Sequence, residues 1–275
     1  MNNIEILNKH GFKFNKSFGQ NFIFDTNFLK SIVDETVSEN DVVLEIGAGA
    51  GTLTSTLCKK AKRVISFEID KNLKPVLEEN LSEHNNITLV FEDIMKVDME
   101  KIEELTREEY IMVANLPYFI TTPIIFKFLE NATKLKSLAI MVQLEVAERL
   151  VAKPGSKDYG AITPAIDYRG TAKIIRRVNR NMFTPAPNVD SAIVKIDLDK
   201  NKYQVEDTKV LDETIKCAFA MRRKTLENNI KSYFKLPSET ISKIISDAGL
   251  PPQIRGEKLS TEELVRLSQI IKKYL

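Results

Sequence analysis

The chain has 275 residues, of which 43% are hydrophobic and 28% are charged, the composition of a soluble globular protein. No apolar run approaches the roughly 20 residues of a membrane helix. The N-terminus also lacks a signal-peptide pattern, so we expect a cytoplasmic protein that does not bind membranes. Two cysteines and two histidines argue against a disulfide framework, a metal site and a Ser-His-Asp triad.

The formal net charge of +2 is unevenly distributed along the chain. Residues 1–150 hold 17 Lys or Arg and 23 Asp or Glu, a net charge of −6, whereas residues 151–275 hold 23 and 15, a net charge of +8. This asymmetry predicts that the second half contacts a polyanion, although basic runs are usually only solvated faces. The basic clusters are Arg169, Lys173, Arg176, Arg177 and Arg180, and Arg222, Arg223 and Lys224.

Strand-like and helix-like segments alternate over the first two-thirds of the chain, which indicates an α/β fold with a mainly parallel sheet. The expected strands are Val42–Ile46, Val64–Phe67, Ile87–Phe91, Tyr110–Ala114 and Leu138–Val142. The expected helices are Thr52–Lys60, Asn72–Leu81, Pro123–Leu129 and Leu144–Val151. Two later strands, Lys173–Val178 and Ala192–Leu198, flank a proline-containing segment and are expected to form a hairpin-like antiparallel edge.

The last part of the chain has a purely helical pattern and follows a polar linker at 201–206. Apolar residues recur at helical spacing over Leu211–Phe234, and a second helix starts at Ser238. Ser260 and Glu263 have the spacing of a capping box that opens a final helix. We therefore expect a catalytic domain at residues 1–200 and a small all-helical domain at residues 207–275.

A glycine-rich turn follows the first expected strand, with Gly47, Gly49 and Gly51 at alternate positions after Glu45. Glycines at a strand-to-helix turn let the backbone approach a ligand closely, and the next helix aims its amides at that ligand. A dinucleotide-binding fingerprint would place glycine where Thr52 stands, so the pattern favours S-adenosylmethionine. An NAD-dependent dehydrogenase is the disfavoured alternative.

Three polar residues end the next strands of the expected sheet. Glu68 suits the hydroxyls of a ribose, Asp93 suits an adenine amine, and Asn115 follows a buried strand. Each carboxylate alone could equally be a helix cap or a solvated turn. Because all of them meet the glycine turn at one edge of the sheet, they predict a single binding site there.

The segment Asn115-Leu116-Pro117-Tyr118 suits a flat ring that bears an amine. The Asn115 amide oxygen and the Leu116 carbonyl would accept the amine hydrogens, Pro117 would fix the backbone, and Tyr118 would offer a stacking face. A strand that ends at a proline and carries a core tyrosine would give the same four residues, so the motif alone decides nothing.

Four more segments carry motifs: Phe18–Ile23, Phe183–Ser191, Phe219–Leu226 and Arg255–Ser260. With Val43–Gly51 and Asn115–Tyr118, they make the chain resemble the ribosomal RNA adenine dimethyltransferase family nearly from end to end. The resemblance implies a Rossmann-like S-adenosylmethionine-dependent methyltransferase fold, with a mainly parallel seven-stranded sheet, helices on both faces and a small helical C-terminal domain. It also implies two methyl transfers to the exocyclic amine of adenosine.

The resemblance implies roles for further residues. The cofactor would be contacted by Gln20, Asn21 and Ile23; at the position of Ile23 the family more often has Leu. Phe183 would lie near the target base with Tyr118. RNA would be held by the basic residues Arg176, Arg177, Arg222, Arg223 and Lys224.

Two branches of the family share these motifs. Leu116 and the Arg222–Lys224 segment resemble the branch that modifies two adjacent adenosines in a hairpin loop near the 3′ end of small-subunit rRNA, within an immature 30S-type particle. The other branch modifies one adenosine of large-subunit rRNA. Pro164 and Asp167, within 160–167, depart from the first branch and put substrate contacts there in doubt. We expect a monomer, and a non-enzymatic assembly factor is a rival reading.

Overall fold

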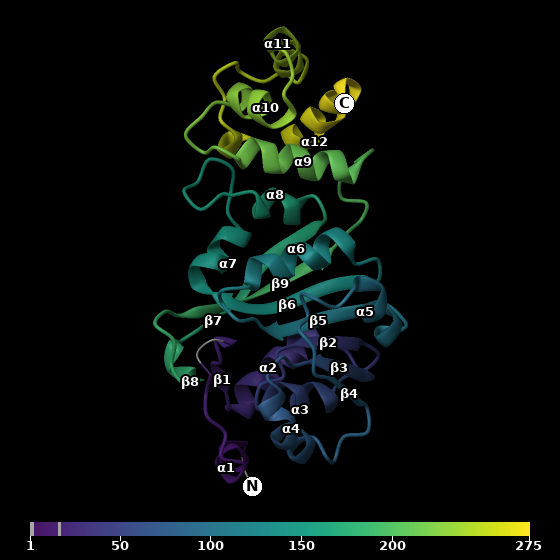
Figure 1. Cartoon of the computed structure of the whole chain (residues 1–275), viewed down its shortest axis with the longest axis vertical. Coiled ribbons are helices and arrows are strands. Elements are labelled where there is room, and N and C mark those ends of the chain that lie inside the picture. The colour runs from purple at the N-terminus through teal and green to yellow at the C-terminus, as the bar shows by residue number, and fades with distance from the viewer. Residues whose placement is uncertain (1–2, 16–17) are drawn as a thin grey trace. The chain divides into compact units, whose positions relative to one another are not determined.

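A computed structural model of the chain describes residues 3–15 and 18–275 (Figure 1). The chain divides into two compact units, Met1–Ala147 with Lys173–Asp197, and Glu148–Ala172 with Leu198–Leu275. Residues 148–172, placed in the catalytic domain from sequence, thus group with the helical unit in the structure. Within that second unit the buried Tyr159 hydroxyl donates to the Leu259 carbonyl at 2.8 Å.

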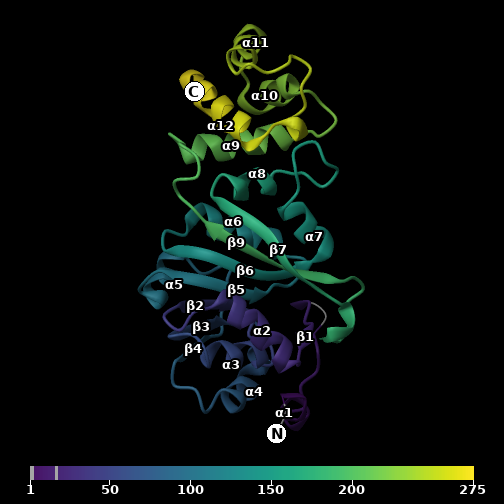
Figure 2. The ribbon, with the colours of Figure 1, turned by 180° about the vertical axis from the view of Figure 1, so that it is seen from behind.

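The first unit contains a seven-stranded sheet in the order β4-β3-β2-β5-β6-β9-β7. Its strands are β2 (Val42–Ile46), β3 (Arg63–Phe67), β4 (Ile87–Val90), β5 (Tyr110–Asn115), β6 (Leu135–Gln143), β7 (Gly170–Val178) and β9 (Ser191–Leu198). The five strands from β4 to β6 are parallel, and β9 runs antiparallel to β6. The predicted mainly parallel sheet is confirmed, and Figure 2 shows β9 between β6 and the edge strand β7.

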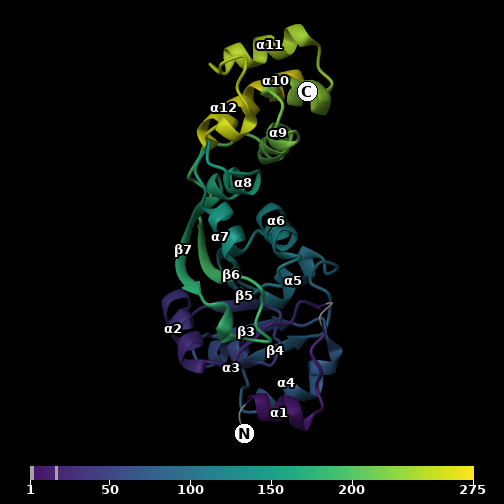
Figure 3. The ribbon, with the colours of Figure 1, turned by 90° about the vertical axis from the view of Figure 1, so that its left-hand side faces the viewer.

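The helices of the first unit mostly lie between the strands along the chain. They are α1 (Asn3–Lys9), α2 (Thr26–Thr36), α3 (Thr52–Cys58), the 3-10 turn η2 (Lys71–Leu73), α4 (Lys74–Asn80), α5 (Met99–Thr106) and α6 (Thr121–Asn131), and α7 (Leu144–Leu150) follows β6. Figure 3 shows α2 and α6 on opposite faces of the sheet. Apolar side chains of α2 and α3, among them Val33 and Leu57, pack on Val43 and Val64 of the sheet.

The order of the strands places a binding crevice at β2. Every residue of β2 is buried, and it pairs with β3 on one side and β5 on the other, so successive connections leave in opposite directions. In open α/β sheets, ligands bind at the carboxyl edge beside such a switch point.

A second, two-stranded sheet was not predicted from the sequence. It pairs β1 (Phe22–Ile23) with β8 (Phe183–Thr184) and sets Ile23 opposite Phe183. Two residues per strand give too short a pattern for alternation to reveal. The pairing fixes the N-terminal motif against a segment about 160 residues later in the chain.

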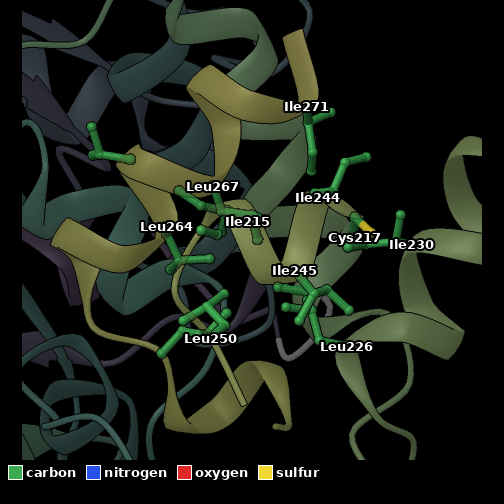
Figure 4. Close-up of a cluster of buried hydrophobic side chains, with 14 of the residues drawn as sticks. Ile215, Cys217, Leu226, Ile230, Ile244, Ile245, Leu250, Leu264, Leu267 and Ile271 are labelled. Carbon is green, nitrogen blue, oxygen red and sulfur yellow. The ribbon is translucent and has the colours of Figure 1, made fainter. Parts of the chain in front are cut away.

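The second unit is helical around one apolar core. Its helices are α8 (Ile162–Asp167), α9 (Thr208–Phe219), α10 (Leu226–Phe234), α11 (Ser238–Asp247) and α12 (Thr261–Ile271). Figure 4 shows side chains from α9, α10, α11 and α12 meeting in this core, including Ile215, Ile230, Ile244 and Leu267. The predicted capping box is present, because Ser260 accepts from the Glu263 amide and Glu263 accepts from that of Ser260.

The helical pattern over Leu211–Phe234 is broken, contrary to the expectation of a continuous helix. The α9 helix ends at Phe219, and the Thr225 side chain caps α10 by accepting from the Asn228 amide. The Leu226 amide donates to Ile254 and not to the preceding turn. Arg222, Arg223 and Lys224 therefore lie in a turn between helices. No helix in the described ranges is long and apolar enough to cross a bilayer.

Gly256 is a packing constraint of the second unit. A Cβ added there would lie 2.0 Å from the Ala218 carbonyl oxygen, whereas one added at Gly160 would meet only the Arg149 side chain, at 4.0 Å. We expect Gly256→Ala to lower the free energy of unfolding by about 1–3 kcal/mol, because the clash is with backbone. Chemical denaturation measures this effect with Gly160→Ala as the control, and equal stability of the two variants would contradict it.

Candidate active site

A cavity of about 320 Å³ opens within the first unit at the carboxyl ends of β2, β3 and β5. Its volume is in the range of small-molecule sites. Among the described residues, eleven predicted site residues line it: Gln20, Asn21, Ile23, Gly47, Gly49, Glu68, Asp93, Asn115, Leu116, Pro117 and Tyr118. Glu45, Gly51 and Phe183 are not part of the lining.

Glu68 holds the glycine turn in place. Its Oε2 accepts from the Gly49 amide at 2.9 Å, and its Oε1 accepts from the Asp70 amide at 2.8 Å. Burial raises the pKa of this carboxyl, while the two amide donors oppose the rise. The Phe22 ring lies against Gly49, where a Cβ would come within 3.0 Å of it and the φ of +55° disfavours a side chain. Glu68 thus carries a structural task besides its predicted ribose contact.

Glu45 lies beneath the turn and is completely buried. Its Oε2 accepts from Thr54 on α3 at 2.7 Å and from Ser66 on β3 at 2.6 Å. Its Oε1 has no hydrogen-bond partner among the described residues. Burial raises the pKa of Glu45 to about 7, against the effect of the two hydroxyl donors. Glu45 therefore links β3 to α3, the helix that follows the glycine turn.

Asp93 lies in the loop after β4, and a side chain of α6 is hydrogen-bonded to this loop. The Asp93 side chain accepts from the Met95 amide at 3.0 Å, which closes a local turn. The Lys127 ammonium donates to the carbonyls of Ile94 and Val97. Because Asp93 and Ile94 both line the cavity, Lys127 connects its predicted adenine end to the helix that follows Tyr118.

Asn115 is oriented by the N-terminal segment. Its Nδ2 donates to the Asn21 carbonyl at 2.9 Å, and Asn21 itself donates to Gly19 at 3.1 Å. Since an amide has donors on one side and an acceptor on the other, this bond turns Oδ1 away from Asn21. The Leu116 amide donates to the Met141 carbonyl at 3.2 Å, which fixes the next residue at the strand end.

Tyr118 is half-buried and held at its hydroxyl. The hydroxyl is 2.8 Å from that of Ser191, which is fully buried. Burial raises the pKa of Tyr118, so the phenol is neutral at physiological pH. The ring is thereby fixed in the cavity lining, on the turn that starts at Pro117.

Phe183, predicted to lie near the target base, is 3% exposed. Because β8 pairs with β1, the Phe183 side chain packs in a buried cluster with Ile23, Leu29 and Val178. The structure therefore does not bring its ring to the cavity, and a stacking role for Phe183 stays a prediction.

The predicted RNA-binding residues are divided between the two units. Arg176 donates to Ser31 and lies 3.3 Å from Glu35 in the first unit, and Arg177 is exposed nearby on β7. In the second unit Arg222 donates to the Lys157 carbonyl at 2.9 Å. Arg223 and Lys224 are exposed in the same turn. Arg169, grouped with the first cluster from sequence, instead pairs with Asp212 at 2.7 Å, and both side chains are mostly buried.

The atypical segment at 160–167 forms α8 in the second unit. Pro164 is buried, and the Asp167 carboxylate accepts from Lys202 at 2.6 Å and from Tyr203 at 3.3 Å. Asp167 therefore anchors the chain just before α9.

Comparison with known proteins decides the family. The model of the family described as ribosomal RNA adenine dimethylase matches residues 11–273. The chain belongs to the ribosomal RNA adenine dimethylase family. A relative from Clostridium botulinum, named ribosomal RNA small subunit methyltransferase A, is 45% identical over 273 residues and 98% of both chains. One of the same name from Bacillus licheniformis is 44% identical, over 98% of this chain and 96% of its own.

Solved structures agree with this membership. A dimethyladenosine transferase from Plasmodium falciparum has a TM-score of 0.77 at 25% identity, covering 92% of this chain and 98% of that one. The 23S rRNA methyltransferase ErmE has a TM-score of 0.68 at 26% identity, covering 92% and 100%. The predicted enzyme class, a methyltransferase of the ribosomal RNA adenine dimethylase family, is confirmed.

Sequence reasoning missed three residues that shape the site. Ser191 holds Tyr118, Lys127 holds the Asp93 loop, and Phe119 lines the cavity. Phe119 follows the motif directly and was open to detection as a second aromatic. Ser191 ends the motif segment Phe183–Ser191, but nothing local indicated its contact with Tyr118, and Lys127 gave no local signal, because each acts on a residue remote in the sequence.

The pKa of Glu45 predicts a dependence of stability on pH. A carboxyl whose pKa rises from 4.5 when unfolded to about 7 when folded binds its proton more tightly in the folded state. The free energy of unfolding should therefore fall between pH 4.5 and 7, by at most about 3 kcal/mol. Glu45→Gln cannot titrate there, so its stability relative to the wild type should rise over that interval. Urea denaturation at pH 5 and pH 8 measures the difference, and a constant difference would contradict the prediction.

Proposed function

We propose that the chain transfers two methyl groups from S-adenosylmethionine to the exocyclic amine of each of two adjacent adenosines, in a hairpin loop near the 3′ end of small-subunit rRNA. Membership of the ribosomal RNA adenine dimethylase family supports the reaction, and the relatives' name supports the small subunit. The observation that carries the proposal is the Asn115 amide, oriented by Asn21 in the cavity that the glycine turn also lines.

The residues present fit S-adenosylmethionine. The cavity joins the glycine turn to two carboxylates, Glu68 and Asp93, and to the apolar side chains of Ile69 and Ile94. Carboxylates match the hydroxyls and amines of a nucleoside, and the apolar side chains match its ring. Asn21, Ile23 and Gly47 would hold the rest of the molecule. When bound, S-adenosylmethionine supplies a methyl group on a positively charged sulfur.

The protein's own task is to position an amine that is a weak nucleophile, because its lone pair is delocalised into the purine ring. Asn115 Oδ1 and the Leu116 carbonyl accept the two amine hydrogens, which favours a pyramidal nitrogen with a localised lone pair. Tyr118, fixed by Ser191, stacks on the purine. Positioning and electrostatics then carry most of the rate, and no residue removes a proton before the transfer.

Three finer expectations belong to this proposal. The substrate is an immature 30S-type particle, the chain acts as a monomer, and it acts in the cytoplasm. A dehydrogenase is disfavoured by Thr52 at the position of the third fingerprint glycine. An assembly factor that binds rRNA without catalysis would not need an oriented Asn115 amide.

We expect Asn115→Ala to lower kcat for methyl transfer at least 100-fold, because the amine loses the acceptor that localises its lone pair. Transfer from radiolabelled S-adenosylmethionine to immature small subunits measures this loss. Affinity for S-adenosylmethionine, measured by calorimetry, should change only a few-fold.

Asn131→Ala serves as the control, because Asn131 is an exposed asparagine at the end of α6 that donates to the Lys127 carbonyl. Retained turnover in Asn115→Ala would refute the role of the amide.

We expect the triple variant Arg222→Ala, Arg223→Ala and Lys224→Ala to bind the particle more weakly and to reduce the slope of log affinity against log salt by about 2–3, since each phosphate contact contributes roughly one. A filter-binding titration across salt concentrations measures the slope.

The matched control removes the same charge from Lys209, Lys231 and Lys243, which are exposed on α9, α10 and α11. Equal slopes for both triple variants would place the RNA contacts elsewhere.

A further inference from the structure

Phe119 is a large apolar side chain at the rim of the cavity, and it is 65% exposed. A single exposed apolar residue is ordinary on a soluble protein. Its place makes Phe119 informative, because it follows Tyr118 directly and lines the same cavity as Asn115.

The backbone that carries Phe119 is fixed. The Ile120 amide and the Thr121 hydroxyl both donate to the Pro117 carbonyl, each at 3.1 Å. Thr121 is 1% exposed, so this anchor is shielded from water. Tyr118 and Phe119 are the two central residues of the closed turn, and both rings are presented from a rigid support.

One side of the Phe119 ring rests on the N-terminal segment. A Cβ added to Gly19 would lie 3.2 Å from Phe119 Cε1, and Gly19 has a φ of +62°. The contact orients the ring, while the exposed fraction of the side chain remains open for a ligand.

The two aromatic residues of the turn differ in what they can contact. Tyr118 is half-buried with its hydroxyl tied to Ser191, so it suits a base inside the cavity. Phe119 at the rim suits a base outside it. Phe183, the other aromatic with an expected stacking role, is 3% exposed.

We propose that Phe119 stacks on the nucleobase next to the target adenine, outside the cavity. This inference rests on the proposed function, in which the two targets are adjacent adenosines, so that one target has the other, a purine, on the side that Phe119 faces. Stacking on an aromatic side chain is a common way to hold single-stranded nucleotides that have left their helix. Phe119 then favours substrates with a purine beside the target, and it takes no part in the transfer itself.

The test compares Phe119→Leu with Phe119→Tyr in the full chain. Leucine preserves an apolar side chain against Gly19 but has no aromatic ring for stacking, whereas tyrosine preserves the aromatic ring. We expect Phe119→Leu to raise the KM for immature small subunits about tenfold, with kcat and the KM for S-adenosylmethionine within twofold of wild type. Phe119→Tyr should restore the wild-type KM. Ile4→Ala is the control, because Ile4 is 44% exposed in the same unit and is not part of the cavity lining.

A second substrate distinguishes stacking of Phe119 on the neighbouring base from a purely structural contact of Phe119 with Gly19. Small subunits reconstituted with uridine in place of the neighbouring adenosine should raise the KM of the wild type, because a pyrimidine stacks less. The KM of Phe119→Leu should be nearly the same for both particles. An unchanged KM in Phe119→Leu, or an equal penalty on both particles, would overturn the proposal.

Binding of the particles without turnover, measured by filter binding, keeps the two proposals distinct. If the wild type transfers no methyl group, the proposed function fails, and the dissociation constants of the variants still decide the role of Phe119.

Discussion

The hydrogen bond from Asn115 to the Asn21 carbonyl connects the end of β5 to the N-terminal segment. An amide free to rotate would present its donors or its acceptor with equal ease, and only the acceptor suits an amine. The bond removes that freedom. Because Asn21 bonds to Gly19 and precedes β1, the orientation of the amide depends on the positions of Gly19 and of β1.

That packing is built from remote parts of the chain. The β1–β8 pairing holds Ile23 against Phe183, and Phe22 covers Gly49. Glu68 fixes the same turn from the next strand through the Gly49 amide. The glycine turn and the end of β5 are therefore parts of one connected framework, in which the Glu68 and Asn115 side chains bond to backbone partners. Such preorganisation lets a site work by positioning, since little has to be rearranged as charge develops.

Much of this was predictable from sequence, for physical reasons. The strands Val42–Ile46 and Tyr110–Asn115 are apolar except for Glu45 and Asn115 near their carboxyl ends, and turn residues follow them, so these ends and their polar residues were evident. Long-range pairing was not evident. The hydroxyl of Tyr118 is hydrogen-bonded to that of Ser191, 73 residues later, and neither residue type by itself indicates this contact.

Two helical features also differ from the sequence-based expectation, for different reasons. The α2 helix was missed, although Asp25 caps it and Leu29, Ile32 and Val33 have helical spacing. The break before α10 was missed because helical periodicity continued through it, while the tertiary bond from Leu226 to Ile254 decided the backbone path. Residues 148–172 lack a strong pattern of their own, and their grouping follows from contacts such as Tyr159 with Leu259.

The most direct test of the whole account is the identity of the modified nucleotide. Immature small subunits incubated with the chain and labelled S-adenosylmethionine can be digested and examined by mass spectrometry. The account predicts adenosine carrying two methyl groups on its exocyclic nitrogen, at two adjacent positions near the 3′ end of the rRNA. Label on a ring nitrogen, on ribose, or only on large-subunit rRNA would contradict it.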